Sequence, residues 1–499
     1  MLRIHHPPKG EANFIHFYNL TLNGESSQLW FCRVSSVPHN TVWPGCQRPA
    51  HQTELASFIS FEMDEPVTMS LSTWSSIKEM VVRPLSRGIT PTLSEDGRTI
   101  TLTITRCGHY TLEINDQHQA VHIFANPVND FGVDKSDPNV LYYAPGVHNV
   151  GTIELQDNQT LFVDGGAVLY GSVQVFEKKN VRIVGYGVID GSQEVRTDDN
   201  FLISWGLFEP DADFRDTDVL RAHLKKFSIL EGCVHLYSCQ DCEVNGIIAR
   251  DSATFAYVLA NCDRVNVDWA KTIGMWRYNS DGIDTFNSRY IRVSNCFLRD
   301  FDDCMVIKGI KGWDKANQHH ITVTGCTIWC DWGSCLELGA ETCADEYHDI
   351  LWEDCDIIHA SHVCMRLHNT DRAWVHDMTV RNIRCEYSRH DLEPVYQHDM
   401  SASYPSFGKP YQPLLINSPI YDGPYSNDHI LGRVSGLRFE NIQIYADEGI
   451  PVPEVIFGGA DAEHCNKDVT IENVTFNGRR LSPAEIPLKT SKWDEVTVK

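Results

Sequence analysis

Two short acidic runs lie about twenty residues apart in the middle of this chain. The first is Asn279-Ser280-Asp281-Gly282-Ile283-Asp284, and the second is Phe301-Asp302-Asp303-Cys304-Met305-Val306-Ile307. They place Asp281, Asp302 and Asp303 at the ends of two apolar, strand-like segments. Carboxylates placed in this way can share one site, and paired carboxylates are what the hydrolysis of glycosidic bonds requires.

The elements around these runs repeat. From about Leu141 the chain alternates short apolar strands with turns rich in Asn, Asp, Gly or Cys. The clearest copies recur every 28 to 30 residues: Ile291 to Leu298, Ile321 to Ile328, Ile350 to Ile357 and Met378 to Cys385. Each copy is too short to bury its own apolar residues, so neighbours must stack, which predicts a parallel β-helix. A β-propeller is the competing repeat fold, but its blades are usually longer and four-stranded.

Stacked coils would bring the aspartates together. Asp281 and Asp302 are 21 positions apart, a plausible length for one short coil, and adjacent coils lie about 4.8 Å apart. Like charges held that close do not ionise together easily, so one pKa should rise and leave an acid beside one or more bases. Taken singly, each aspartate fits a turn better than a catalyst, because Asp commonly begins or ends strands. The joint pattern favours a function.

The cysteines fit the same repeat. Cys296, Cys326 and Cys355 hold equivalent places in successive copies and predict an internal ladder of small buried side chains. The total of seventeen is odd, and with no apparent leader it indicates reduced thiols rather than a disulfide framework. Cys239-Gln-Asp-Cys242 is a single CxxC without a partner pair at zinc-site spacing, so we expect no metal and no cofactor.

Charge and hydropathy narrow the expected partners. Asp and Glu outnumber Lys and Arg by 67 to 42, and the net charge of −25 argues against nucleic acid or an anionic membrane surface. Nothing approaches the ~18 uninterrupted apolar residues of a membrane span. The first twenty residues contain no apolar run typical of a signal peptide, so we expect a cytoplasmic protein, or a secreted one if a leader was removed. The sequence leaves the oligomeric state open.

The front of the chain has a different pattern, which predicts a β-sandwich over residues 1–128 before a β-helix over residues 129–499. Its short alternating strands are expected at Phe14 to Leu20, Leu29 to Val34, Leu55 to Phe61, Val67 to Ser72, Thr99 to Thr105 and Ala120 to Ala125. Near the other end, Ser388 to Asp428 is rich in Pro, Tyr, Ser and Gly and breaks the repeat. We interpret it as a long insertion that walls a binding cleft.

The aspartate runs also resemble a known family. Asn279-Ser280-Asp281 followed by Asp302-Asp303 is similar to the Asn-Thr-Asp and Asp-Asp motifs of the polygalacturonases, glycoside hydrolase family 28. Gly333 to Gly339 stands in the place of that family's Gly-His-Gly motif, and Met365-Arg366-Leu367-His368 in the place of its Arg-Ile-Lys motif. The resemblance extends over most of the second domain, where it includes Tyr143 to His148, Val163 to Ala167 and Gly185 to Gly191.

The front domain is similar to another family. His39 to Gly45 and Phe61 to Pro66 resemble the β-sandwich that precedes the helix in family 49, the dextranases and isopullulanases. Both resemblances imply a right-handed parallel β-helix, an aspartate trio and inversion at the anomeric carbon. They imply that Asp302 is the general acid and that Asp281 and Asp303 hold the attacking water as bases.

The sequence departs from the polygalacturonase pattern at two places. Ser334 stands where that family has a histidine, and His368 stands where its lysine binds a uronate carboxylate. These differences favour a neutral or differently charged sugar. Arg366 remains and is expected to hold a substrate oxygen or to form an ion pair. The full set of expected substrate-binding residues is Asn279, Lys308, Trp332, Glu337, Arg366 and His368.

Aromatic residues near the same strand ends offer surfaces for sugar faces. Trp276, Tyr278, Trp332 and Trp374 are the candidates, and packing in the core or at an edge is the competing role for each of them.

Two other functions remain open on sequence alone. A β-helix polysaccharide lyase would use clustered acidic residues to hold Ca²⁺, which acidifies a uronate. A non-catalytic carbohydrate-binding β-helix would bind sugar without cleaving it. The sequence therefore predicts an all-β, two-domain protein that hydrolyses the glycosidic bonds of a poly- or oligosaccharide, and it leaves the sugar, the linkage and the position of attack open.

Overall fold

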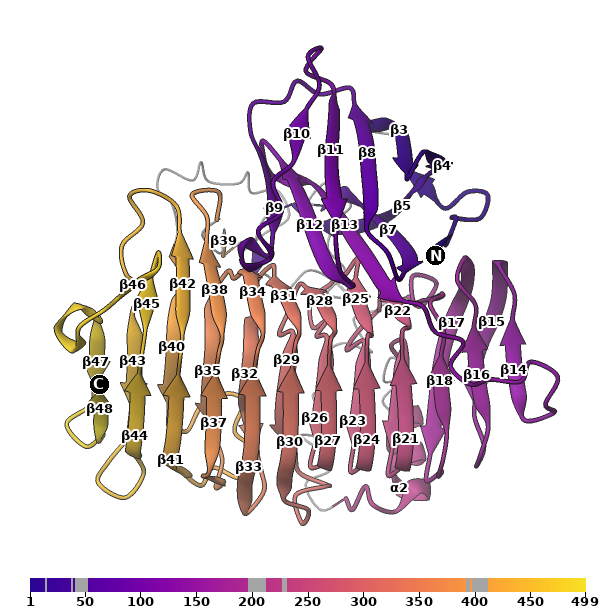
Figure 1. Cartoon of the computed structure of the whole chain (residues 1–499). Coiled ribbons are helices and arrows are strands. Elements are labelled where there is room, and N and C mark those ends of the chain that lie inside the picture. Colours follow the sequence, from indigo (N-terminus) through magenta and orange to yellow (C-terminus); the bar gives the residue numbers. More distant parts are fainter. Residues whose placement is uncertain are drawn as a thin grey trace.

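The computed structural model describes residues 1–13, 16–36, 39–40, 53–195, 212–226, 231–391, 395–396 and 412–499. Figure 1 shows a β-sandwich, antiparallel except for the parallel pair β7 and β13, seated on the side of a long parallel β-helix, which confirms the predicted all-β fold class. Among the described residues, no helix combines the length and the apolar character needed to cross a bilayer.

The sandwich consists of two sheets. One has the order β2-β5-β7-β13-β12-β9 with β1 beside β7, and the other has the order β10-β11-β8-β3-β4. The strands are β1 (Leu2–Ile4), β2 (Ala12–Asn13), β3 (Phe17–Leu22), β4 (Glu25–Ser27), β5 (Leu29–Ser35), β7 (Thr53–Met63), β8 (Val67–Thr73), β9 (Met80–Arg83), β10 (Thr92–Leu93), β11 (Thr99–Ile104), β12 (Gly108–Ile114) and β13 (Asp116–Pro127). A short pair, β6 (His39–Asn40) with β39 (Val395–Tyr396), links the two parts of the chain.

Five of the six predicted front strands coincide with observed ones. The sixth, expected at Phe14 to Leu20, begins in residues outside the described part, where β3 starts at Phe17. The other front strands, β1, β2, β4, β6, β9, β10 and β12, were not predicted. The sandwich sheets end at Pro127 and the first β-helix strand begins at Val140, so the expected division after residue 128 lies between them and stays a prediction.

Three series of parallel strands form the β-helix. The first is the 13-stranded sheet: β14 (Val140–Tyr143), β16 (Thr160–Val163), β18 (Arg182–Val184), β21 (Gln240–Asn245), β24 (Asp263–Asp268), β27 (Arg289–Ser294), β30 (Gln318–Thr324), β33 (Glu346–Glu353), β36 (Trp374–Val375), β37 (Met378–Arg381), β41 (Arg433–Glu440), β44 (Asn466–Glu472) and β48 (Val496–Val498). The other two series share a 21-stranded sheet.

The first series within that sheet lies under the sandwich. It comprises β15 (Gly146–Glu154), β17 (Ala167–Phe176), β19 (Val188–Asp190), β22 (Ile248–Arg250), β25 (Lys271–Ile273), β28 (Phe297–Asp300), β31 (Thr327–Cys330), β34 (Asp356–His359), β38 (Arg384–Tyr387), β42 (Gln443–Ala446), β45 (Thr475–Phe476) and, antiparallel at the end, β46 (Arg479–Arg480).

The second series within that sheet carries the aspartates at its strand ends. It also starts from β17 and continues through β20 (Val234–Tyr237), β23 (Tyr257–Ala260), β26 (Ile283–Phe286), β29 (Met305–Gly309), β32 (Ser334–Thr342), β35 (Val363–Asn369), β40 (Leu414–Pro419), β43 (Val455–Gly458) and β47 (Leu488–Thr490). The helical elements are α2 (Thr217–Lys226) and the short turns η3 (Leu85–Arg87) and η4 (Pro483–Glu485).

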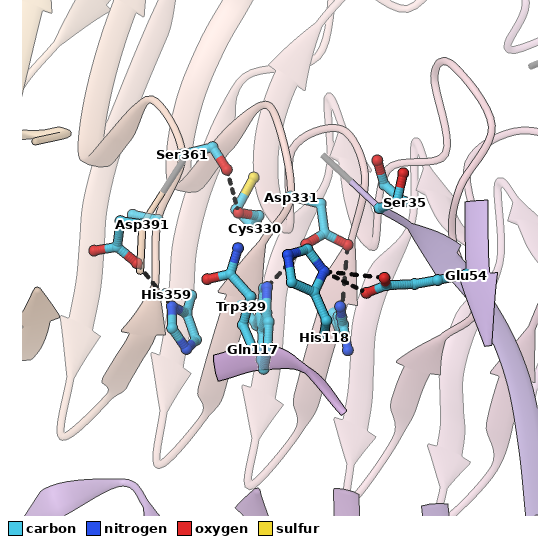
Figure 2. Close-up of a pocket in the computed structure, with 13 residues that line it drawn as sticks. Ser35, Glu54, Gln117, His118, Trp329, Cys330, Asp331, His359, Ser361 and Asp391 are labelled. Atoms are coloured by element: carbon cyan, nitrogen blue, oxygen red, sulfur yellow. Dashed lines mark hydrogen bonds and ion pairs between the residues drawn. The ribbon is translucent and has the colours of Figure 1, made fainter. Parts of the chain in front are cut away.

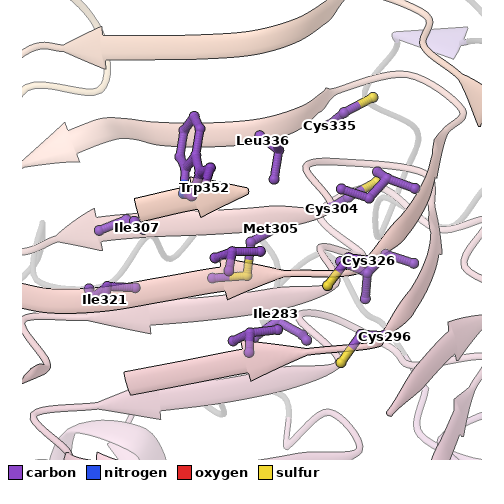
Figure 3. Packing of buried hydrophobic residues seen from close by; sticks show 14 of the residues in the cluster. Ile283, Cys296, Cys304, Met305, Ile307, Ile321, Cys326, Cys335, Leu336 and Trp352 are labelled. Atoms are coloured by element: carbon purple, nitrogen blue, oxygen red, sulfur yellow. The ribbon is translucent and has the colours of Figure 1, made fainter. Parts of the chain in front are cut away.

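The repeat has a backbone cause. Asn295, Gly325, Asp354 and Asn382 take φ values of 51°, 68°, 55° and 55° at the same bend in successive coils. This left-handed conformation is accessible mainly to Gly, Asn and Asp, which explains the turn composition seen in the sequence. The residue after the bend then points inward, as Cys296 and Cys326 do in Figure 3.

The predicted cysteine ladder is confirmed inside the β-helix. Cys296, Cys326 and Cys355 are fully buried in one apolar core, and the thiol of Cys326 contacts both of the others. All sixteen cysteines in the described part of the chain are free thiols, including Cys239 and Cys242. Cys239 and Cys242 donate hydrogen bonds to backbone carbonyls, which fits a packing role.

A second apolar cluster joins the sandwich to the β-helix. Trp30, Phe58 and Phe124 of the sandwich pack on Phe297 and Trp329 of the first series. The Trp30 and Phe58 rings stack with centroids 5.5 Å apart. Because the sandwich covers this series, the second series remains as the face on which side chains near the aspartates can meet a substrate.

Candidate active site

Asp281 lies in the turn that leads into β26. Asn279 takes a left-handed φ of 55°, and the buried Ser280 hydroxyl donates to the Arg277 carbonyl at 2.6 Å, so the turn has a defined shape. Asp281 is only 1% exposed. Its Oδ2 accepts a hydrogen bond from Lys308 Nζ at 2.7 Å, which fixes the carboxylate next to a cation.

Asp302 and Asp303 lie in the turn between β28 and β29, one coil later. The backbone N–H of Asn279 donates to Asp302 Oδ2 at 3.2 Å, so the two predicted motifs are in direct contact. The backbone N–H of Ser334, in the following coil, donates to Asp303 Oδ1 at 2.7 Å. Three successive coils therefore meet at these two carboxylates.

Gly333 makes that approach possible. A Cβ atom at this position would lie 2.6 Å from both the backbone nitrogen and Oδ1 of Asp303. That separation is shorter than any ordinary contact, so a side chain would push the turn away from the carboxylate. The glycine in the sequence motif is thus explained by the close passage of the backbone beside Asp303.

Burial and neighbouring charges shift the pKa values of the residues in this cluster. Burial, and then the charge of Asp281, raise the pKa of Asp302 well above its ordinary value. Burial, Glu337 and Asp302 raise the pKa of Asp303 in the same direction. Burial alone would lower the pKa of Lys308, but Asp281 and Asp284 outweigh it and raise that pKa. The site therefore combines a fixed cation with carboxyl groups whose pKa values are raised, which is the pattern expected of acid–base chemistry.

Two further carboxyl groups belong to this cluster and were missed from the sequence. Asp284 is fully buried on β26, with Oδ1 3.2 Å from Lys308 Nζ. Glu341, on β32, has a pKa raised by burial and is close enough to interact with Lys308 and Asp281. Each could have been found in the sequence as a charged residue inside an otherwise apolar strand. Asp284 even lies within the first acidic run, Asn279 to Asp284.

Glu337, Arg366 and His368 form a neighbouring group. Strand pairing places Glu337 beside Arg366 on β32 and β35. His368 Nδ1 contacts Glu337 Oε1 at 3.3 Å. Burial alone would raise the pKa of Glu337, but Arg366 and His368 lower it, so this carboxylate is charged. All three predicted residues lie together, with Glu337 near enough to Asp303 to influence its pKa.

The predicted insertion contributes two tyrosines. Residues 392–394 and 397–411 lie outside the described part of the chain, but Tyr421 and Tyr425 are described. The Tyr421 hydroxyl contacts His368 Nε2 at 2.7 Å, and the two rings stack with centroids 5.3 Å apart. Tyr425 is 47% exposed, but desolvation around its hydroxyl and then Asp302 raise its pKa to about 12. The sequence indicated a wall here without indicating which residues would form it.

The aromatic candidates separate into different places. Trp332 is half-buried on the turn beside Gly333, where its ring stacks on Phe301 at a centroid distance of 5.9 Å. Tyr278 is tilted against it at 6.1 Å. Trp276 is nearly buried and donates to Asp251. Trp374 does not lie near these strand ends, because it belongs to β36 of the 13-stranded sheet and donates to Ser435.

Comparison with known proteins finds one family model and several solved structures that are similar to this chain. Residues 153–389 match the family model of glycosyl hydrolases family 28. Among solved structures, Dex49A from Penicillium minioluteum covers 99% of this chain and 96% of its own, with 14% identity and a TM-score of 0.62. That likeness shows that the fold is shared across the sandwich and the β-helix together. A comparison with curated proteins gave no match.

Two further structures are similar at lower scores. A hyperthermoactive exopolygalacturonase from Thermotoga maritima has 15% identity and a TM-score of 0.45, and covers 68% of this chain and 84% of its own. A family 28 exopolygalacturonase from Yersinia enterocolitica has 14% identity and a TM-score of 0.46, and covers 87% and 96%. The segment matched by the family model contains all three predicted aspartates, and the chain is a glycoside hydrolase that carries the family 28 pattern in residues 153–389.

Proposed function

We propose that this protein hydrolyses glycosidic bonds of a neutral glycan with inversion, using Asp302 as the general acid. The observation that carries the proposal is the buried contact between the two motifs, in which Asp302 accepts a hydrogen bond from the backbone N–H of Asn279. The pKa of Asp302 is also raised. A carboxyl group that keeps its proton near neutral pH can deliver it to the departing glycosidic oxygen.

Asp281 and Asp303 are proposed to hold the attacking water. Lys308 contacts Asp281 and favours its charged form, so Asp281 can accept the proton that the water loses. Asp303 is oriented through Oδ1 by the Ser334 N–H, which leaves its second oxygen to position the water. In an inverting enzyme the base and the acid stand on opposite faces of the sugar, with room for the water between.

The charge balance beside the aspartates supports a neutral sugar. Arg366 could pair with a substrate carboxylate, but Glu337 already supplies an anion next to it. A uronate at this position would add a negative charge next to Glu337, which is already charged. Coulomb repulsion in a buried site makes that addition unfavourable.

Attack at a chain end is proposed from the surroundings of β26. Phe214, Leu220 and Trp313 pack over Val258 and Phe286, which belong to β23 and β26. These outward-facing strand positions are consequently not open to sugar units. A glycan that reaches the aspartates from this side meets an apolar cover, which favours cleavage of one or two terminal units.

The test is a panel of α-glucans, other neutral oligosaccharides and pectic fragments, with proton NMR of the first product. We expect a neutral substrate, an inverted product anomer and small products from the start of the reaction. Retention of configuration would contradict the mechanism, and long internal fragments would contradict terminal attack. Formation of an unsaturated, ultraviolet-absorbing product that EDTA prevents would instead identify a calcium-dependent lyase. Binding without cleavage would identify a non-catalytic carbohydrate-binding protein.

A further inference from the structure

A row of stacked histidines lies on the 13-stranded sheet, away from the aspartates. The first histidine of the row, His319 on β30, pairs in register with His348 on β33. Their rings stack with centroids 5.0 Å apart and an interplanar angle of 13°. His376, in the next coil, stacks on His348 at 5.2 Å and 12°. The β-helix repeat therefore holds imidazoles at a fixed spacing.

The residue after each histidine turns its side chain back towards the row. His320 and Asp349 both take a left-handed φ of 54°. His320 Nδ1 lies 2.9 Å from His319 Nδ1, and Asp349 Oδ2 lies 2.8 Å from His348 Nδ1. Across the two coils, His320 Nδ1 is 3.7 Å from Asp349 Oδ2. One ligand atom from each of His320, His348 and Asp349 lies within 4.8 Å of the other two.

These separations suit a small divalent ion. In a tetrahedral zinc site, with bonds of about 2.0 to 2.1 Å, neighbouring ligand atoms are roughly 3.3 Å apart. The measured 2.8 Å and 3.7 Å lie on either side of that value. His320 and Asp349 are exposed and His348 is half-buried, so an ion can reach them and small side-chain rotations suffice to bind it.

We propose that His320, His348 and Asp349 bind a divalent transition-metal ion of the zinc class, with His319 adjacent as a further imidazole. Two imidazoles and one carboxylate suit Zn²⁺, Cu²⁺ or Ni²⁺, whereas Ca²⁺ and Mg²⁺ prefer sites made of oxygen ligands. The ion would join β30 to β33 and so stabilise the stacking of two coils. The site is separate from the proposed hydrolysis, because its ligands lie on the 13-stranded sheet.

A second group of possible ligands shows the contrast. Cys343, Asp371 and Asp428 also approach one another. Arg372 Nη1 lies among them, 3.1 Å from Cys343 Sγ and 2.7 Å from Asp428 Oδ2. Asp371 accepts hydrogen bonds from the backbone of Thr342 and Asp428. A guanidinium already supplies the positive charge there, so this group carries no metal proposal.

The test is a titration of the EDTA-treated, dialysed full chain with ZnCl₂, followed by calorimetry and by thermal unfolding. We expect His348→Gln and His320→Gln each to lose about one bound Zn²⁺ per chain and to lose the rise in melting temperature that Zn²⁺ gives the unsubstituted protein. His464→Gln is the matched control, because His464 makes the same imidazole–carboxylate contact with Asp461 at 2.9 Å and lies outside the proposed site.

Three outcomes decide the proposal. The proposal is supported if His348→Gln and His320→Gln each lose the bound Zn²⁺ while His464→Gln binds it normally. Equal zinc stoichiometry in all four proteins would overturn it, because the bound ions would then belong to other side chains. Displacement of Zn²⁺ by an equal concentration of CaCl₂ would also overturn it, because a site of two imidazoles and one carboxylate should discriminate against a hard cation. Far-ultraviolet circular dichroism of each variant checks that the β-helix is retained.

Discussion

Two buried clusters of charge in this molecule are built from the same residue types and behave differently. One is the aspartate site. The other is the junction between the sandwich and the β-helix, where Arg83 contacts Glu113 at 3.0 Å and Glu386 at 2.6 Å. His359 lies between Glu113 and Asp391 in the same network. Figure 2 shows the side of this junction around His359 and Asp391, near His118 and Glu54.

The number of cations separates the two clusters. At the junction, burial would raise the pKa of Glu113, but Arg83 and His359 lower it to about 2. Burial would lower the pKa of His359, but Glu113 and Asp391 raise it to about 9. At the aspartate site one lysine faces several carboxyl groups, and the pKa values of Asp302 and Asp303 rise instead. Glu386 at the junction has a pKa raised to about 7, because burial outweighs Arg83 there. The cations of the junction thus hold Glu113 charged, whereas the larger excess of buried carboxyl groups at the aspartate site favours proton chemistry.

The largest expected effect comes from removing the proposed acid. Asp302→Asn should lower kcat by about a thousandfold on whichever glycan of the panel is cleaved, because the leaving oxygen then receives no proton. Its melting temperature should stay the same or rise, since the neutral amide replaces a buried carboxyl group that is costly to ionise. Steady-state kinetics and thermal unfolding measure the two effects. A variant that retains more than a tenth of the original kcat would remove Asp302 from the mechanism.

The opposite pattern is expected at the junction. Arg83→Met leaves Glu113 and Glu386 without their shared cation, and breaking a buried ion pair in this way typically costs about 3 to 5 kcal/mol. Urea unfolding at pH 7 measures this cost, while kcat per folded molecule should stay unchanged. Arg264→Met is the matched control, because its pair with Asp241 is exposed to solvent and should change stability far less. Equal losses in both variants would contradict the distinction.

The sequence predicted these two clusters to different extents. Local motifs and a coil-length spacing were enough to place Asp281, Asp302 and Asp303 together, because the β-helix turns sequence separation into stacking. The junction depends on Arg83 meeting Glu386, 303 positions away, and no repeat connects the two segments. Tyr421 was equally hidden, since a loop inserted between coils has no register that fixes its side chains. The repeat was therefore readable, and contacts made outside it were not.

The pH dependence of stability should also distinguish the junction. The folded-state pKa of His359, about 9, exceeds its ordinary value of 6.5, so its contribution is complete below about pH 6.5 and is lost as the pH rises through 9. We expect the free energy of unfolding to fall by about 3 kcal/mol over that window relative to His359→Gln, whose neutral side chain cannot titrate. Urea titrations at pH 6.5, 8 and 9.5 measure this difference, and a constant difference would show that His359 is neutral in the fold.

The smallest effect should come from Lys308, which contacts Asp281 in the aspartate site. Lys308 lowers the pKa values of Asp302 and Asp303, although burial dominates both. In Lys308→Met, protonation of the base should occur at higher pH, and so should loss of the proton from the acid. Both limbs of the pH–rate profile should therefore move upwards by about one unit. Lys315→Met, at a lysine that is 66% exposed, should leave the profile in place. A profile that keeps its position while kcat falls would mean that Lys308 only holds Asp281 in place. The raised pKa values of Asp302 and Asp303 would then result from burial and from the neighbouring carboxyl groups alone.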